Sequence, residues 1–142
     1  MIQKTSKFNR KDRFLNIAHY ATGLQHIGFP TKDIVGSIRF YTDLGFEKIY
    51  ETQNEGAGVV FLQLKDLVIE MWEGEPKGVS GSIDHIAIDV TDIEAVFQIL
   101  TSAGLNAIEG KICNLPFWEK GVRYFMISGP NAEKLEFIQR IK

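Results

Sequence analysis

Gln25-His26-Ile27-Gly28-Phe29 has a counterpart 59 residues further along the chain, Asp84-His85-Ile86-Ala87-Ile88, counted from His26 to His85. The alignment continues without a gap, placing Asp33 on Asp92, Thr42 on Thr101, Gly45 on Gly104 and Ile49 on Ile108. Self-similarity at a fixed offset is the mark of a repeated structural unit. The chain is therefore expected to consist of two copies of one fold unit.

The size of the chain requires the two copies to share a core. With 142 residues, the protein is large enough for one domain but not for two independent hydrophobic cores. Its composition, 44% hydrophobic and 24% charged, is that of an ordinary globular protein, and its formal net charge is −2. This charge balance gives no electrostatic basis for binding nucleic acid or an anionic membrane.

The absence of a recognisable targeting signal and the single cysteine favour an intracellular protein. Charged residues interrupt every apolar run before the roughly 18 to 20 residues that a membrane span needs, and no signal peptide opens the sequence. The one cysteine, Cys113, has no internal partner, which fits a reducing compartment. We expect a cytoplasmic protein in which Cys113 is a small packed side chain.

Each copy has the pattern of a βαβββ unit. In the first, strands are predicted over 24–29, 46–51, 59–64 and 67–72, with a helix that Asp33 caps and Gly45 ends. In the second, strands are predicted over 83–90, 105–109, 122–128 and 134–139, and the helix lies between Asp92 and Gly104.

These patterns predict an α+β fold. Residues 24–140 form a single domain, made of a unit over 24–73, a Gly- and Pro-containing linker over 74–82 and a unit over 83–140. Residues 1–23 form an N-terminal appendage with a short helix.

The alternation of side chains along a strand places four polar residues on one face of the sheet. His26 shares a face with Gly28, and His85 with Ala87, while their neighbours are apolar and face the helices. Glu70 and Glu136 lie on the same side in the last strand of each copy. A valine would pack as well at these positions, so two imidazoles and two carboxylates suggest ligands of a divalent cation.

Five stretches of the chain resemble the vicinal-oxygen-chelate superfamily, which includes glyoxalase I, epimerases, fosfomycin-resistance enzymes, dioxygenases and bleomycin-binding proteins. They are 24–28, 37–46 (Ser37-Ile38-Arg39-Phe40-Tyr41 with Leu44-Gly45-Phe46), 68–70, 84–87 and 129–137 (Gly129-Pro130-Asn131 with Lys134-Leu135-Glu136-Phe137). The resemblance covers residues 24–140. It implies paired βαβββ units that build a U-shaped mixed sheet with helices on the convex face, and a homodimer that acts on a small molecule.

The resemblance also implies a metal set and a chemistry. Its ligands are His26, Glu70, His85 and Glu136, and they hold one divalent ion, with zinc or nickel favoured and iron, manganese or cobalt possible. Glu70 is similar to the second ligand of glyoxalase I, which favours a lyase or isomerase that moves a proton next to a carbonyl through an enediolate. Glu136 is implied as the mobile base, with Glu70 as a ligand or partner base.

Two positions depart from the glutathione-using members of the family. Pro30 and Gly74 stand where those enzymes carry an arginine and an asparagine, so the sequence leaves open whether a thiol is used. It also leaves open whether the four ligands come from one chain or from two.

Two alternatives remain at this stage. One is an epimerase or dioxygenase of the same family that uses His26, His85 and Glu136 with iron, cobalt or manganese. The other is a non-catalytic protein that binds a small molecule such as an antibiotic, for which alanine at His26 and Glu136 would spare ligand affinity.

The segment 114–124 is the best candidate for substrate contacts. Phe117 and Trp118 lie on a predicted loop and could stack on an apolar substrate, and Arg123 could hold an anionic group. The competing interpretation, weighed evenly, is that the two rings close the end of the sheet and Arg123 is solvated.

Overall fold

The computed structural model describes residues 17–20, 22–79, 81 and 83–142, and they form two βαβββ units. The first unit contains β1 (Ile27–Thr31), α1 (Ile34–Asp43), β2 (Glu47–Asn54), β3 (Ala57–Leu64) and β4 (Leu67–Glu73). The second contains β5 (Ile86–Asp89), α2 (Ile93–Ser102), β6 (Cys113–Leu115), β7 (Val122–Ser128) and β8 (Lys134–Arg140). None of the described helices is long and apolar enough to cross a membrane.

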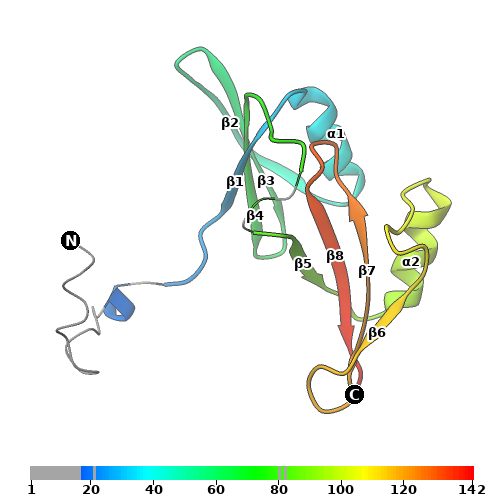
Figure 1. Ribbon diagram of the computed structural model, residues 1–142. Coiled ribbons are helices and arrows are strands. Elements are labelled where there is room, and N and C mark those ends of the chain that lie inside the picture. The colour runs from blue at the N-terminus through cyan, green and yellow to red at the C-terminus, as the bar shows by residue number, and fades with distance from the viewer. Residues whose placement is uncertain (1–16, 21, 80, 82) are drawn as a thin grey trace.

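Each unit contributes one four-stranded mixed sheet (Figure 1). The strand orders are β1-β4-β3-β2 and β5-β8-β7-β6, so the two units have the same topology. In both, the first strand runs parallel to the last and the other pairs are antiparallel. The α+β class and the duplication predicted from the sequence are confirmed.

The helix boundaries follow from the capping residues. Asp33 Oδ1 accepts a hydrogen bond of 3.0 Å from the backbone amide of Gly36, and Asp92 Oδ1 accepts one of 3.1 Å from Ala95. Such caps satisfy amide groups that have no partner within the helix. After α1 the backbone turns at Gly45, whose φ of +107° is readily adopted only by glycine.

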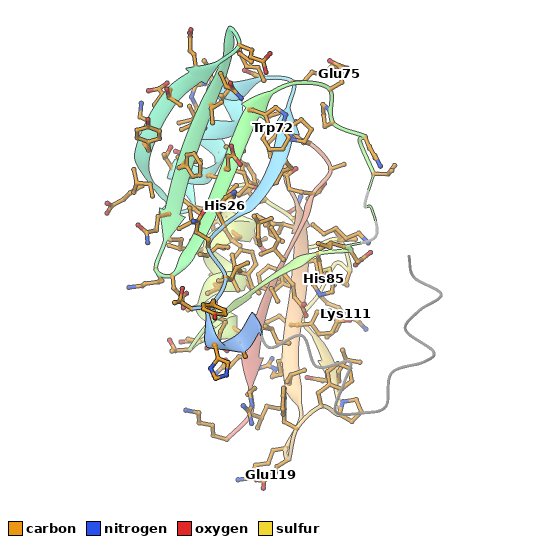
Figure 2. The ribbon with its side chains drawn as sticks, turned by 90° about the vertical axis from the view of Figure 1, so that its left-hand side faces the viewer. His26, Trp72, Glu75, His85, Lys111 and Glu119 are labelled. Carbon is orange, nitrogen blue, oxygen red and sulfur yellow. The ribbon has the colours of Figure 1, made fainter. Side chains whose placement is uncertain are left out.

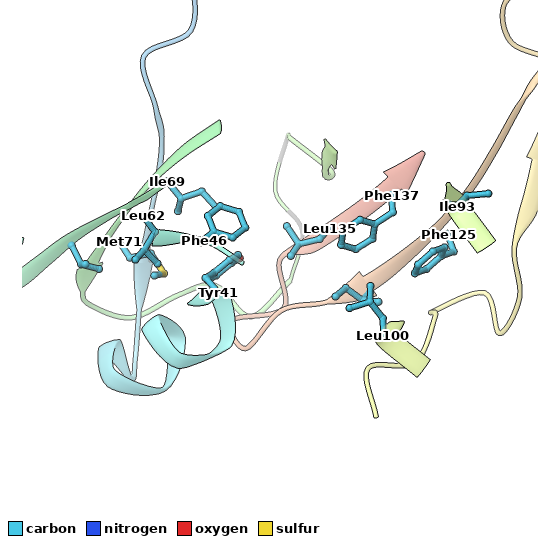
Figure 3. Packing of buried hydrophobic residues seen from close by; sticks show 12 residues of the cluster. Tyr41, Phe46, Leu62, Ile69, Met71, Ile93, Leu100, Phe125, Leu135 and Phe137 are labelled. Atoms are coloured by element: carbon cyan, nitrogen blue, oxygen red, sulfur yellow. The ribbon is translucent and has the colours of Figure 1, made fainter. Parts of the chain in front are cut away.

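One hydrophobic core joins the two units. Tyr41 and Phe46 of the first unit lie near Leu135 of the second, as Figure 3 shows. Leu135 belongs to the same buried cluster as Phe125 and the apolar residues of α2. Among the described residues, twelve buried ones belong to this core: Tyr41, Phe46, Val60, Leu62, Ile69, Met71, Ile93, Leu100, Phe125, Ile127, Leu135 and Phe137. The expectation of a shared core is met.

A polar network crosses the junction between the units. Tyr41 Oη donates a hydrogen bond of 2.6 Å to Glu133 Oε2. Thr31 Oγ1 donates to Asn131 Oδ1 at 3.1 Å, and Asn131 Nδ2 donates to Ser37 Oγ at 3.2 Å. Thr31, Ser37, Tyr41, Asn131 and Glu133 are called the junction network below. They tie the loop between β7 and β8 to β1 and α1.

One predicted strand is wrong. Residues 105–109 do not form a strand, and the second strand of the second unit is β6, over Cys113–Leu115. The amide of Ile108 donates to Met126 O at 2.7 Å, but the next donor of β7, Met126 N, is taken by the Glu109 carboxylate at 2.9 Å. A side chain thus occupies the position of a neighbouring strand, and the chain turns at Gly110.

The other boundaries shift by a few residues. β1 begins at Ile27 rather than Leu24, and β5 spans Ile86–Asp89 rather than 83–90. Of the predicted appendage, residues 1–16 and 21 lie outside the described residues, and Ile17–His19 form one turn of 3-10 helix.

Candidate metal centre

The first unit places His26 beside Glu70. His26 directly precedes β1, and Glu70 lies in β4 opposite Gly28. His26 Nε2 is 3.2 Å from Glu70 Oε1. A Cβ at Gly28 would lie only 3.1 Å from Glu70 Oε1 and 3.1 Å from Trp72 Cζ3, so glycine leaves the room that this pair needs. Trp72 is half-buried on the face of this sheet that carries Glu70.

The second unit repeats the pair with His85 and Glu136. Glu136 lies in β8 opposite Ala87, and its Oε1 is 2.9 Å from His85 Nε2. Its side chain is only 8% exposed, whereas that of His85 is 35% exposed. Burial raises the pKa of Glu136 and the charge of Glu109 adds to the rise, although His85 opposes it. Such a carboxyl group is suited to taking and returning a proton.

Both histidines are oriented by the residue that precedes them. His26 Nδ1 lies 2.6 Å from Gln25 Oε1, and His85 Nδ1 lies 2.9 Å from Asp84 Oδ2. Because both partners are oxygen acceptors, each Nδ1 carries a proton and donates it. The hydrogen bond from His85, followed by one from Lys134, lowers the pKa of Asp84. In each unit Nε2 is thereby directed toward the glutamate, the arrangement by which histidine ligands of metals are usually held.

The two pairs stay separate within one chain. Figure 2 shows His26 and His85 in different halves of the molecule. In the part of the chain that the structure describes, no three His, Cys, Asp or Glu side chains gather in a group that could hold a metal ion. Each chain therefore presents two separate pairs, His26 with Glu70 and His85 with Glu136, which are called the half-sites below.

The three predicted substrate-contact residues lie at the far end of the second unit. Phe117 and Trp118 are 53% and 66% exposed. Trp118 packs over the guanidinium of Arg140, 4.3 Å from the ring centroid. Arg123 alternates with Tyr124 along β7 and donates to Glu94 of α2 at 2.9 Å, so it lies on the helix side of the sheet.

Sequence reasoning missed the residues that hold the histidines. Gln25 and Asp84 occupy equivalent positions in the two copies, and both carry a side-chain oxygen directly before the histidine. That repeated oxygen was visible in the alignment. Arg140, which stacks on Trp118, carried no comparable signal because its partner lies 22 positions away.

The chain belongs to the glyoxalase/bleomycin resistance protein/dioxygenase superfamily, whose model matches residues 23–112. It is similar to an uncharacterized protein, YwbC, of Bacillus subtilis, with 32% identity over 128 residues that cover 84% of this chain and 99% of YwbC.

Two solved structures share the fold. A glyoxalase family protein from Enterococcus faecalis superposes with a TM-score of 0.70 and 20% identity, covering 84% of this chain and 98% of its own. The fosfomycin resistance protein FosX of Listeria monocytogenes, in complex with Mn(II) and sulfate, has a TM-score of 0.66 and 16% identity, covering 85% and 94%.

Proposed function

We propose that the protein is a metal-dependent, glyoxalase I-like lyase or isomerase that moves a proton between carbons next to a carbonyl group. The observation that carries this proposal is the matched orientation of His26 and His85. Each holds its Nδ1 proton on an oxygen of the preceding residue and directs Nε2 toward a glutamate. Histidines that only pack in a core would not require the same hydrogen bond to Nδ1 and the same glutamate beside Nε2 in both units.

The four donors fit one divalent ion. Imidazole nitrogen and carboxylate oxygen together suit zinc, nickel, iron, manganese or cobalt, with zinc or nickel favoured. His26, Glu70, His85 and Glu136 would hold the ion, which would supply Lewis acidity for the negative charge that develops on substrate oxygens. Glu70 lies close enough to His26 to serve as the fourth donor, which favours a lyase over family members that use two histidines and one glutamate.

Glu136 is the proposed base. Its buried carboxyl group and raised pKa favour reversible protonation. A proton taken by Glu136 from one carbon can return to the neighbouring carbon while the substrate stays bound.

We further propose that two copies of the chain complete the site. One chain holds two half-sites, and in a symmetric homodimer the His26–Glu70 pair of one chain would face the His85–Glu136 pair of its partner. Each dimer then contains two complete sites.

Mixing two inactive variants tests this arrangement. His26→Ala and His85→Ala should each lose tightly bound metal and the exchange of substrate protons into deuterated water, measured over a panel of α-hydroxy carbonyl compounds and hemithioacetals. A dimer that contains one chain of each variant keeps one intact site. Unfolding and refolding an equal mixture should therefore restore about a quarter of the wild-type metal and exchange.

Two results would contradict the proposal. If the mixture stays as inactive as the single variants, the four ligands do not come from two chains. If both variants retain stoichiometric metal, the histidines are not ligands, and a non-catalytic binding protein becomes the better interpretation.

A further inference from the structure

The last strand of the second unit carries a row of side chains that leads away from Glu136. Glu136, Ile138 and Arg140 alternate onto one face of β8, and their partners across β7 are Met126, Tyr124 and Val122. Four residues of strand span roughly 13 Å. The face therefore has a carboxylate at one end, an apolar middle and a cation at the other end.

Arg140 is held in place but its charge is unpaired. The ring of Trp118 lies 4.3 Å from the guanidinium carbon, and the Trp118 backbone has a φ of +65°, which non-glycine residues rarely adopt. Within the described part of the chain, Arg140 forms no ion pair, whereas Arg123 is neutralised by Glu94 on the opposite face. A guanidinium that is stacked on a ring and has no carboxylate partner can donate hydrogen bonds to an anion.

The surface next to Arg140 is hollow. A cavity of about 1080 Å³ lies at the end of the sheet, where β5 ends. Its lining includes Trp118, Lys120, Arg140 and Lys142, together with Arg123 and Gln139, whose side chains alternate onto the other face. Asp89 and Glu119 are the carboxylates that line it. Cationic groups outnumber acidic ones there, although the chain as a whole has a net charge of −2. Figure 2 shows Glu119 at the end of the molecule remote from His26.

We propose that Arg140 and Trp118 form a binding site for the anionic end of an elongated substrate. The substrate class is an organic anion whose apolar body lies over Ile138 and Tyr124 and whose carbonyl end reaches Glu136. This inference rests on the proposed function only for the position of the reacting carbon. It differs from the sequence-based prediction, in which Arg123 was the anchor.

Decanoate and decyl phosphate are suitable probes, with decanol as the neutral control. Their affinities for the full chain are measured by calorimetry in the presence of a chelator, so that metal plays no part. Arg140→Gln should weaken binding of the preferred anion about tenfold, the usual range for a hydrogen bond to a charged group, and should leave decanol unchanged. The indole N–H signal of Trp118 in nuclear magnetic resonance spectra should shift on addition of the anion to the wild type.

Arg39→Gln is the matched control because it removes the same charge from an exposed position on α1, in the other unit. It should bind all three probes as the wild type does. The proposal is overturned if Arg140→Gln binds the anions normally, if Arg39→Gln loses as much affinity, or if the Trp118 signal does not move. Because the binding assay contains no metal, it tests this site separately from the proposed reaction. Anion binding by a protein that shows no proton exchange when divalent metal is supplied would refute the proposed reaction and leave this site standing.

Discussion

The junction network offers the sharpest test of how the two units are joined. Tyr41→Phe removes only the hydroxyl that donates to Glu133 Oε2 at 2.6 Å and leaves the buried ring in place. The other oxygen of Glu133 keeps its hydrogen bond of 2.7 Å from the amide of Asn131. The variant therefore isolates one contact between the units.

The expected cost follows from the partners of this bond. A hydrogen bond to a charged group contributes about 1.5 to 3 kcal/mol, and the half-buried Glu133 can recover part of that from water. We expect Tyr41→Phe to lower the free energy of unfolding by about 1 to 2 kcal/mol. Urea unfolding followed by tryptophan fluorescence measures it, with an unchanged dependence on urea concentration.

A double-mutant cycle with Glu133→Gln assigns the effect to this contact. The combined variant should lose less stability than the sum of the two single variants, since both remove the same interaction. Tyr50→Phe, which removes the hydroxyl of an exposed ring, is the control and should leave stability unchanged. Additive effects in the cycle, or a Tyr41→Phe variant as stable as the Tyr50 control, would refute this account of the junction.

Three further predictions concern the half-sites and the buried tyrosine. Asp84→Asn should weaken metal binding about 10- to 100-fold, measured by competition with a chelating dye, and Asp66→Asn in the exposed β3–β4 turn should have no effect. Glu136→Gln should abolish metal binding yet raise the melting temperature of the metal-free protein at neutral pH. Because the pKa of Glu136 is higher in the folded state than in the unfolded state, its ionisation lowers the stability of the wild type as pH rises above about 4.3. Equal melting temperatures of the variant and the wild type at neutral pH would contradict this prediction. Burial, and after it the charge of Glu133, raises the pKa of Tyr41. The stability of the wild type should therefore fall as pH rises above about 10, more steeply than the stability of Tyr41→Phe. An equal dependence of stability on pH in the two proteins would contradict this prediction.

The repeated sequence pattern predicted most of the fold. The caps at Asp33 and Asp92, the turns at Gly45 and Gly104 and the shared face of His26 and Glu70 follow from local rules, so they could be predicted. The segment 105–109 could not, because its state is decided by Glu109, which bonds to the backbone of β7, 17 residues away. Contacts of that kind leave no mark in local periodicity.

The sequence predicted which histidine and which glutamate lie side by side in each unit, but not how the two pairs are placed relative to each other. Each histidine and glutamate lies within one unit, in adjacent strands whose register the alternation fixes. The relation between the two pairs depends on how the units are joined, through the shared core and the junction network. Its first-unit members Thr31, Ser37 and Tyr41 have apolar counterparts in the second copy, Val90, Val96 and Leu100. Comparing the two copies thus indicates which side chains serve the junction rather than the unit, although not the angle they impose.

In the proposed metal site, the split of the donors into two half-sites would affect how the ion is retained. Under the proposed arrangement, no single chain has enough ligands for tight retention, so occupancy depends on how much protein is present. Dilution below the dimer dissociation constant would release the ion, and adding protein would recapture it. A cell that makes little of this protein would then hold it mostly empty and inactive, even where the ion itself is plentiful.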